Sequence, residues 1–246
     1  MIDLHLHFLP GIDDGAPDLE ASVEMCRMAL ADGCDTLIAT PHQRHDRWLN
    51  QEPEKLLELI DRVREAVGPA PRLELGAEVR VDSELLDELD KGDLSGIQPL
   101  AGGHYLLIEF DRHGFGPEPL EIVHELALGG WRPIVAHPEF VPRISESPDY
   151  AARLVESGAL LQVTAMSLTG DFGYDLQQLV ATLVDRDLVH FVASDAHSPT
   201  YRSPGLGRAR KVLADRWSEE VARRLTEENQ LAVLQDSSIT VAAGTP

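Results

Sequence analysis

The sequence predicts an α/β protein: a distorted seven-stranded (β/α) barrel that forms a single domain with extra C-terminal helices. Short apolar runs alternate with amphipathic stretches along most of the 246 residues, as in repeated βα units around a parallel sheet. The same alternation also suits an open doubly wound sheet, but no glycine-rich phosphate loop follows the first apolar run. The barrel is therefore the favoured architecture.

Seven apolar runs predict the strands, and the stretches between them predict helices. The expected strands are residues 1–6, 36–40, 73–79, 105–110, 132–136, 160–164 and 190–193. The expected helices are residues 18–32, 53–67, 83–89, 119–128, 148–156 and 174–187. Pro53 suits a first helical turn, and Gly33 and Gly68 suit the positions where helices stop.

Three more helical pieces follow the last strand, at residues 205–217, 218–225 and 227–235, with no strand among them. We expect them to close one end of the barrel. The chain then divides into a barrel of about residues 1–200, C-terminal helices of about 205–236 and a tail of 237–246, with no linker or repeat that would mark a second domain.

The composition excludes several classes of partner. Asp and Glu number 42 against 21 Lys and Arg, which gives a formal charge of -21. Such a chain is unsuited to nucleic acid or to anionic membrane surfaces. No run approaches the roughly 20 apolar residues that span a membrane, and residues 1–10 lack the basic start of a signal peptide. These features predict a cytoplasmic protein without membrane insertion.

Cysteine chemistry is not expected to drive catalysis. Cys26 and Cys34 are the only cysteines and form no CxxC pair. A thiol phosphatase also needs an arginine six positions after its cysteine, where this chain has Asp32 and Thr40. Both cysteines are expected to be small buried side chains in a reduced protein.

Nearly every predicted strand ends in a side chain that can bind a metal ion. These residues are His5, His7, His42, Glu78, Glu109, His137, Asp195 and His197, with Asp14 in the loop after the first strand. The ends of parallel barrel strands meet on one face, which is where barrel enzymes carry their active sites. The other histidines, His45, His104, His113, His124 and His190, lack this placement and are expected on the surface or in the core.

This ligand set indicates a type of chemistry. Imidazole and carboxylate ligands together suit manganese, iron or zinc rather than calcium, and a carboxylate such as Glu78 can bridge two ions. Two or more cations can activate a bridging water, clamp phosphate oxygens and stabilise a leaving oxygen. Phosphoester hydrolysis is therefore the expected reaction.

The same residues lie in motifs that resemble the PHP superfamily. The motifs are Met1-Ile2-Asp3-Leu4-His5-Leu6-His7, Leu9-Pro10-Gly11-Ile12-Asp13-Asp14-Gly15, Ala39-Thr40-Pro41-His42, Gly76-Ala77-Glu78, Ala136-His137-Pro138-Glu139 and Ala193-Ser194-Asp195-Ala196-His197. More narrowly, the chain resembles the bacterial manganese-dependent protein-tyrosine phosphatases of capsule and exopolysaccharide operons. Residues 162–170 strengthen the narrower match, and the resemblance covers essentially the whole chain.

The resemblance implies a trinuclear site on a PHP-type distorted barrel. One ion would be held by His5, His7, Glu78 and Asp195, a second by Glu78, Glu109 and His137, and a third by Asp14, His42 and His197. Manganese is the expected metal, with iron, zinc and cobalt as alternatives that the same ligands accept. Asp195, His197 and Arg202 would be the catalytic residues.

Two departures from the family pattern concern the substrate. Arg202 matches a phosphate-binding arginine of the family, but the arginine common after the His-Pro-Glu motif is replaced by Phe140. The next arginine, Arg143, is therefore a second candidate for substrate binding. The family's second histidine after His42 is replaced by Gln43. A slot for an aromatic ring could be lined by Phe140, Phe172 and Tyr201.

The predicted function is hydrolysis of phosphotyrosine in proteins by a metal-bridging hydroxide, linked to control of exopolysaccharide or capsule synthesis. The phosphorylated partner could be a bacterial tyrosine kinase. Phenolate, with a pKa near 10, is a good enough leaving group to need little acid catalysis. Two alternatives stay open: a small-molecule phosphatase such as histidinol phosphatase, and a non-catalytic metal-binding partner of a kinase. A homo-oligomer is also left open.

Overall fold

The computed structural model describes residues 1–82, 84–91, 96–114 and 116–239. In these residues nine short strands, all paired in parallel, form two sheets. The strands are β1 (Ile2–Leu6), β2 (Thr36–Ala39), β3 (His42–Gln43), β4 (Arg72–Leu75), β5 (Glu78–Arg80), β6 (Tyr105–Glu109), β7 (Arg132–Ala136), β8 (Leu160–Thr164) and β9 (Phe191–Ala193). The sheet orders are β1-β2-β4 and β3-β5-β6-β7-β8-β9. The mixed α/β fold with parallel sheets confirms that part of the prediction.

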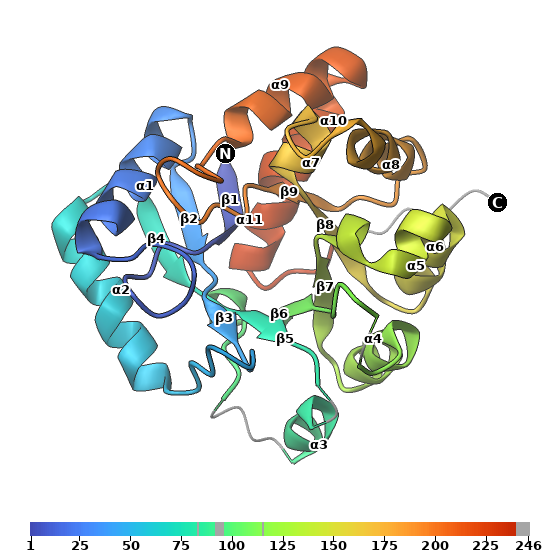
Figure 1. The fold of residues 1–246 in the computed structure, drawn as a ribbon, viewed down its shortest axis with the longest axis horizontal. Helices are drawn as coiled ribbons and strands as arrows, with labels where there is room; N and C mark the ends of the chain where they lie inside the picture. The colour runs from blue at the N-terminus through green and yellow to red at the C-terminus, as the bar shows by residue number, and fades with distance from the viewer. Residues whose placement is uncertain (83, 92–95, 115, 240–246) are drawn as a thin grey trace.

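Helices surround the strands in Figure 1. The α-helices are α1 (Leu19–Ala31), α2 (Pro53–Val67), α3 (Leu85–Asp90), α4 (Pro119–Leu128), α5 (Pro142–Glu146), α6 (Pro148–Glu156), α7 (Ala165–Thr169), α8 (Tyr174–Asp185), α9 (Leu206–Arg216), α10 (Glu219–Arg223) and α11 (Asn229–Leu234). Short 3-10 helices are η1 (Leu100–Gly102) and η2 (Pro138–Phe140). Residue 83 of the predicted third helix and residues 240–246 of the predicted tail lie outside the described residues. No described helix is long and apolar enough to cross a bilayer.

The strand count differs from seven because one predicted strand is divided in two and another is followed by a further short strand. The predicted strand 73–79 is divided into β4 and β5 at Gly76, where a Cβ would lie 2.6 Å from Leu100 Cδ2. The second predicted strand ends before Pro41, which has no N–H to donate, and a further strand, β3, begins at His42. Each of these two chain segments therefore contributes one strand to each sheet.

The two sheets are also linked through β1 and the segment that follows β9. The end of β1 bonds to the segment after β9, because Asp195 N donates to His5 O and His7 N donates to Ala196 O, each at 2.9 Å. A parallel bridge pairs Leu6 with Ala196. These contacts bring the residues that follow the first and last strands into one place.

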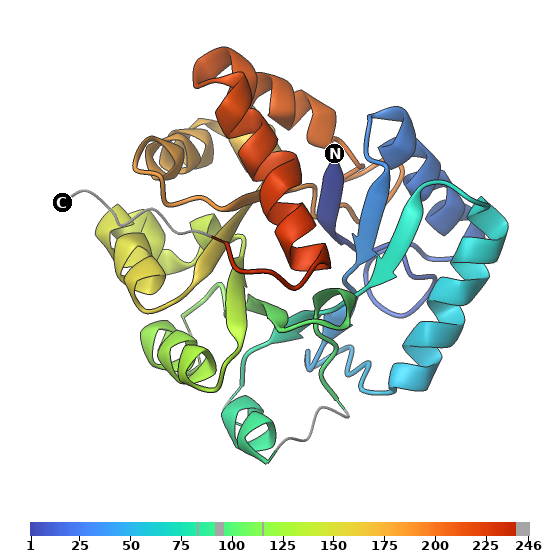
Figure 2. The same ribbon diagram turned by 180° about the vertical axis from the view of Figure 1, so that it is seen from behind.

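The helical segment from α10 (Glu219–Arg223) to α11 (Asn229–Leu234) lies across the back of the strands, opposite the face seen in Figure 1 (Figure 2). α10, the π-helical turn η3 (Arg224–Glu228) and α11 run without a break, although the sequence predicts two separate pieces. Val233 of α11 belongs to a buried apolar cluster with Leu4, Tyr105 and Phe191 from three strands. The side of the strands that faces α11 is thus packed with apolar side chains.

Candidate metal centre

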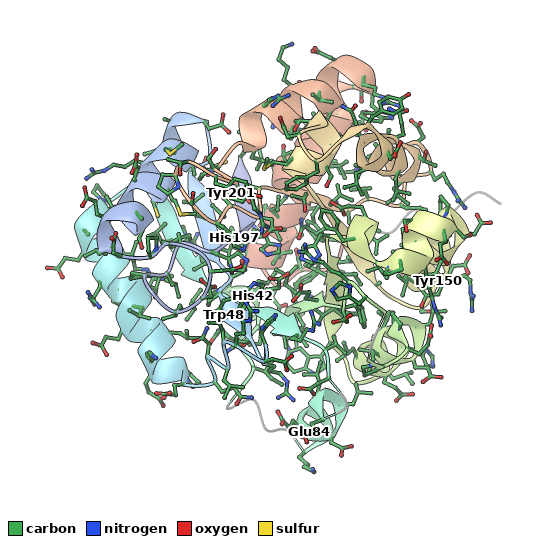
Figure 3. All side chains as sticks on the ribbon, in the orientation of Figure 1. His42, Trp48, Glu84, Tyr150, His197 and Tyr201 are labelled. Carbon is green, nitrogen blue, oxygen red and sulfur yellow. The ribbon has the colours of Figure 1, made fainter. Side chains whose placement is uncertain are left out.

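The nine side chains predicted to bind metal ions lie together where the strands end. They come from β1 (His5), the loop after it (His7 and Asp14), β3 (His42), β5 (Glu78), β6 (Glu109), the residue after β7 (His137) and the segment after β9 (Asp195 and His197). All are buried except Asp14, whose side chain is 46% exposed. Figure 3 shows His42 and His197 near the middle of this face.

Hydrogen bonds at the back of two histidine rings fix which nitrogen faces the cluster. His5 Nδ1 lies 2.7 Å from Gln162 Oε1, and His7 Nδ1 lies 2.9 Å from Asp13 Oδ2. Because these oxygens accept hydrogen bonds, each Nδ1 must donate, and each Nε2 of the neutral ring turns a lone pair toward the centre. A neutral histidine in this tautomer can bind a metal ion through Nε2.

The inward-facing atoms form a set that requires a cation or protons. His5 Nε2 and His7 Nε2 are 3.2 Å apart. Glu78 Oε2 lies 3.6 and 3.5 Å from these two nitrogens, and Asp195 Oδ1 lies 3.4 and 3.6 Å from them. Lone pairs and negative oxygens pointing at one another in a buried site are unfavourable without positive charge between them. The donor set therefore fits a divalent ion.

Two further groups of donor atoms adjoin the first. The structure groups His5, His7 and Asp195; His42, Glu78 and Glu109; and His7, Asp14, His42 and His197, with the donor atoms of each group within 4.8 Å of one another. His42 Nδ1 is 2.9 Å from Glu78 Oε2 yet makes no hydrogen bond to any described residue, an arrangement that would suit two ligands of one ion. His137 is placed beside Glu78 by a 2.7 Å contact between Nε2 and Oε1.

The electrostatics of the cluster favour positive charge. Burial opposes protonation of His7, but the adjacent Asp13 carboxylate outweighs it and raises the pKa of His7 to about 9. Burial is likewise outweighed at His42, where Glu78 raises the pKa to about 11. Burial opposes ionisation of Glu78, but His5 and His42 hold the pKa of this carboxyl well below its usual range. Without metal ions the site holds protons, which cations would displace.

Two residues that the sequence did not single out as functional orient the histidines. Asp13 is buried behind His7 and also accepts hydrogen bonds from the backbone N–H groups of Gly15 (2.9 Å) and His42 (3.1 Å). Gln162 of β8 holds His5. Asp13 and Gln162 contact the ligands from behind, so only the contact geometry identifies them. In the loop after the first strand, the sequence indicated the neighbouring Asp14 as the candidate ligand.

Three predicted site residues have left-handed backbone conformations. The φ angles are +34° at His137, +52° at Asp195 and +53° at Arg202. Residues other than glycine rarely adopt such angles, and those that do cluster at functional sites. Here the conformation turns the chain immediately after β7 and β9, so that His137 and Asp195 can reach Glu78 and His5.

Four arginines line the pocket above the cluster: Arg47, Arg80, Arg112 and Arg202. Arg202 Nη2 lies 2.5 Å from Asp195 Oδ2 and 3.1 Å from Asp195 O, while its buried Nε has no hydrogen-bond partner in the described part of the chain. Arg202 is thus placed at the cluster, as predicted from the sequence, whereas Arg47, Arg80 and Arg112 were not singled out.

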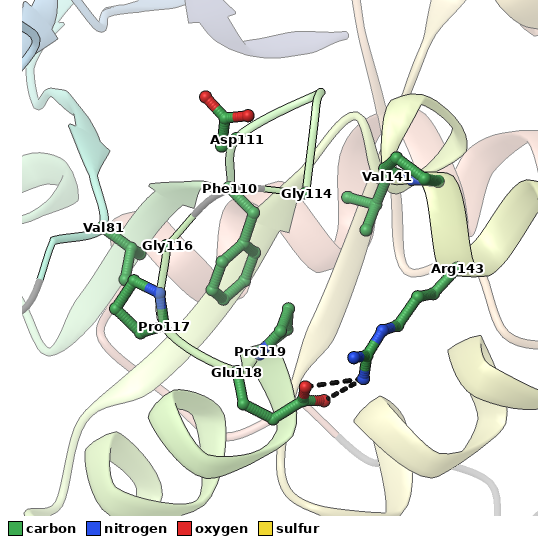
Figure 4. A pocket seen from close by; sticks show the side chains of 11 residues that line it. Val81, Phe110, Asp111, Gly114, Gly116, Pro117, Glu118, Pro119, Val141 and Arg143 are labelled. Atoms are coloured by element: carbon green, nitrogen blue, oxygen red, sulfur yellow. Dashed lines mark hydrogen bonds and ion pairs between the residues drawn. The ribbon is translucent and has the colours of Figure 1, made fainter.

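The structure does not bring Arg143 to this pocket. Its guanidinium forms an ion pair with Glu118 at 2.6 Å, beside a separate small hollow lined by Phe110 and Val141 (Figure 4). The side chain is 57% exposed, on α5. The position of Arg143 three residues after Phe140 misled the sequence argument, because Val141 and Pro142 begin another helix that carries Arg143 away.

Aromatic residues form one wall of the pocket. Trp48 stacks on His42 with ring centroids 5.3 Å apart and planes at 10°, and His45 packs against both. His45 was expected to be an ordinary surface or core residue, but it lines the pocket. Of the predicted aromatic slot, Phe140 and Phe172 contact each other, whereas Tyr201 is 74% exposed.

Gln43, which replaces a family histidine, is buried and has a structural role. Its side chain donates to Asn50 O and accepts from Gln98 N, both at 2.8 Å. It therefore ties two loops together.

A parallel α/β fold with a polar cluster at the strand ends defines a class of metal-binding proteins, and comparison with known proteins identifies the family. The sequence model described as "Capsular polysaccharide synthesis, CpsB/CapC" matches residues 1–235, so the chain belongs to this family. Tyrosine-protein phosphatase YwqE of Bacillus subtilis (strain 168) is 37% identical over 234 residues, which cover 94% of this chain and 91% of that protein. Tyrosine-protein phosphatase CpsB of Streptococcus pneumoniae is 26% identical over 247 residues, 97% of this chain and 100% of that protein.

Solved structures agree with this assignment. A structure from the work on YwqE from Bacillus subtilis and CpsB from Streptococcus pneumoniae, described as unique metal-dependent tyrosine phosphatases, superimposes with a TM-score of 0.91. It is 36% identical and covers 100% of this chain and 99% of that chain. The phosphotriesterase from Mycobacterium tuberculosis has a TM-score of 0.60 at 12% identity, covering 96% and 94% of the two chains, and shares the fold.

Proposed function

We propose that this protein is a metal-dependent phosphatase that hydrolyses phosphotyrosine in proteins and acts in capsule or exopolysaccharide synthesis. The buried histidine and carboxylate cluster, with arginines at its mouth, carries this conclusion. It is the arrangement that phosphomonoester hydrolysis needs, and relatives across the whole chain are named as tyrosine-protein phosphatases. These names favour phosphotyrosine over a small-molecule substrate.

We propose that the cluster holds three divalent ions, with manganese as the expected metal and iron, zinc and cobalt as alternatives. The support is that the donor atoms fall into three groups, each containing both imidazole and carboxylate. When bound, such ions activate water and neutralise the charge of the phosphoryl group. The proposed ligands are His5, His7, Asp14, His42, Glu78, Glu109, His137, Asp195 and His197.

Asp195, His197 and Arg202 are the proposed catalytic residues. His197 Nδ1 donates to Asp195 O at 3.0 Å, which turns its Nε2 toward Asp14. Arg202 is anchored on Asp195 through Nη2, so its remaining N–H groups can bind phosphoryl oxygens without further ordering. This local positive charge offsets the repulsion that a chain of charge -21 exerts on a dianionic phosphate.

The test compares two substrates on one preparation. With manganese added, the protein should hydrolyse a phosphotyrosine peptide at least tenfold more efficiently than histidinol phosphate, and thorough chelation should abolish turnover. Equal activity after chelation, or a preference for histidinol phosphate, would contradict the proposal. Bound metal without turnover of any phosphoester would favour the non-catalytic alternative. Arg202→Ala should retain metal while lowering kcat/KM, because Arg202 is proposed to bind the substrate and is not a metal ligand.

We further propose that the two sheets form one distorted barrel and a single domain. If β2 with β3 and β4 with β5 each count as one interrupted strand, the nine strands reduce to seven. The bonds between β1 and the segment after β9 support closure. A tyrosine kinase as the phosphorylated partner and a cytoplasmic location stay predictions from the sequence.

A further inference from the structure

Arg112 occupies a position in the pocket that neither the motifs nor the donor groups explain. It lies three residues after the end of β6, with its side chain 43% exposed, and it lines the same pocket as Glu109 and His137. Its guanidinium carbon is 4.7 Å from the centre of the Phe140 ring. This distance is that of a cation–π contact.

Most of the hydrogen-bonding capacity of Arg112 is unused among the described residues, whereas Arg80 and Arg202 are anchored by carboxylates. Arg80 is held by ion pairs to Glu109 and Asp111, and Arg202 is held by Asp195. For Arg112, the ionic contact in the described residues is a 3.9 Å approach of Nε to Glu109 Oε1, and it donates no hydrogen bond there. A guanidinium has five N–H groups, which suit a phosphate.

The Phe140 ring is itself firmly placed. Its centroid is 5.8 Å from that of His137, and Phe172 meets it edge-on at 5.9 Å. The ring therefore presents one face to Arg112 beside a predicted metal ligand. An arginine stacked on a fixed ring loses less freedom when it binds a ligand than a free surface arginine does.

We propose that Arg112, held on Phe140, is a substrate-binding residue that donates hydrogen bonds to the phosphoryl oxygens of phosphotyrosine. The proposal rests on the proposed function and specifies how this chain binds the phosphate. Phe140 is then a positioning residue that acts through Arg112. The phosphoryl group would lie between Arg202 and Arg112, which approach from the segments after β9 and β6.

The test measures substrate, product and metal binding separately. Arg112→Ala should lower kcat/KM for a phosphotyrosine peptide by about 10- to 100-fold and weaken competitive inhibition by inorganic phosphate, while metal content stays unchanged. Arg112→Lys should fall between Arg112→Ala and the wild type, because it keeps the charge but loses the planar fork. Arg216→Ala is the matched control: Arg216 also lies 4.7 Å from an aromatic ring, that of Trp217, but outside the pocket.

The positioning role of Phe140 has its own test. Phe140→Leu should raise the KM and the phosphate inhibition constant by a few fold with little change in kcat, because Leu keeps the packing but offers no π face. Phe140→Arg in the Arg112→Ala background should recover phosphate inhibition, because it returns a guanidinium to the same side of the site, beside His137. Recovery without any change in metal content supports a shared phosphate-binding position.

Three results would overturn the inference. Kinetics and phosphate inhibition of Arg112→Ala within twofold of the wild type would exclude contact with substrate. Loss of metal from Arg112→Ala would assign Arg112 to the support of Glu109. An equal defect in Arg216→Ala would point to general destabilisation. If the wild type itself does not hydrolyse phosphotyrosine, the proposed function fails first, so the two failures are distinguishable.

Discussion

Replacing Asp13 by Asn should weaken metal binding without unfolding the protein. The Asp13 carboxylate accepts hydrogen bonds from His7 Nδ1 and from the backbone N–H groups of Gly15 and His42. Asn has nearly the same shape but only one acceptor oxygen, so its NH2 group would meet an N–H donor. His7 would lose both its orientation and the negative charge that makes its ring a better ligand.

The expected magnitude follows from the charge on His7. Its pKa is raised from 6.5 to about 9 despite burial, with Asp13 as the strongest favourable influence, which corresponds to roughly 3 kcal/mol in favour of positive charge. An ion at Nε2 is farther from Asp13 than a proton on the ring, so a smaller effect is expected. Metal affinity should fall about 10- to 100-fold, or roughly 1.4 to 3 kcal/mol, as for other residues behind ligands.

The assay is competition for manganese against a fluorescent chelator, with thermal unfolding of the metal-free protein measured alongside. Asp61→Asn, which alters an exposed ion pair with Arg64 on α2, is the matched control. An unchanged manganese dissociation constant in Asp13→Asn would refute the reasoning. A lower affinity accompanied by a large drop in the Tm of the metal-free protein would instead mean that Asp13 mainly holds the loop.

Glu78→Gln should lose bound metal and phosphatase activity together, as measured by elemental analysis and peptide turnover, because the Glu78 carboxylate contacts the histidines of two donor groups; activity with a full metal complement would contradict this. Gly15→Ala should destabilise the protein by about 1 to 3 kcal/mol, visible as a lower urea midpoint, because a Cβ at this position would lie 2.0 Å from His7 O; a wild-type midpoint would show that the loop moves freely. Burial lowers the pKa of His190 to about 4, so between pH 6.5 and 4 the unfolded chain takes up a proton that the native ring refuses, and up to about 3 kcal/mol of stability is lost as the pH falls. His190→Asn should remove this part of the pH dependence of urea unfolding; parallel pH profiles for the two proteins would exclude it.

The sequence predicted the fold well where periodicity was strong and less well where single residues decide. Every predicted strand overlaps an observed strand, because buried strands of a parallel sheet are short apolar runs. The division at Gly76 depends on the nearby Leu100 side chain, which comes from a distant segment. The five-residue helices α5 and α7 are too short to show a helical period. Thr226, predicted to separate two helices, is instead buried in one continuous helical segment, with its hydroxyl bonded to Ala222 O.

The predicted metal ligands were accessible to sequence reasoning because parallel strands gather their ends on one face. All nine are brought together, and their assignment to ions stays a proposal. The donor groups differ in detail from the implied sets: His42 joins Glu78 and Glu109, and His137 contacts Glu78 without joining a group. These details depend on side-chain direction, and so does the distinction between Arg112 and Arg143.

The division of the strand ring into an apolar half and a polar half explains how the protein can maintain so strained a centre. Beneath α11 the ring is filled by side chains such as Leu4, Tyr105 and Phe191, each fully buried. That packing holds the strand ends in place, so the positive φ angles at His137 and Asp195 and the 3.2 Å approach of His5 Nε2 to His7 Nε2 are maintained. The ligands are therefore already in place for cations to bind without rearrangement of the chain. The free-energy cost of bringing these polar side chains together is offset by apolar packing beneath α11.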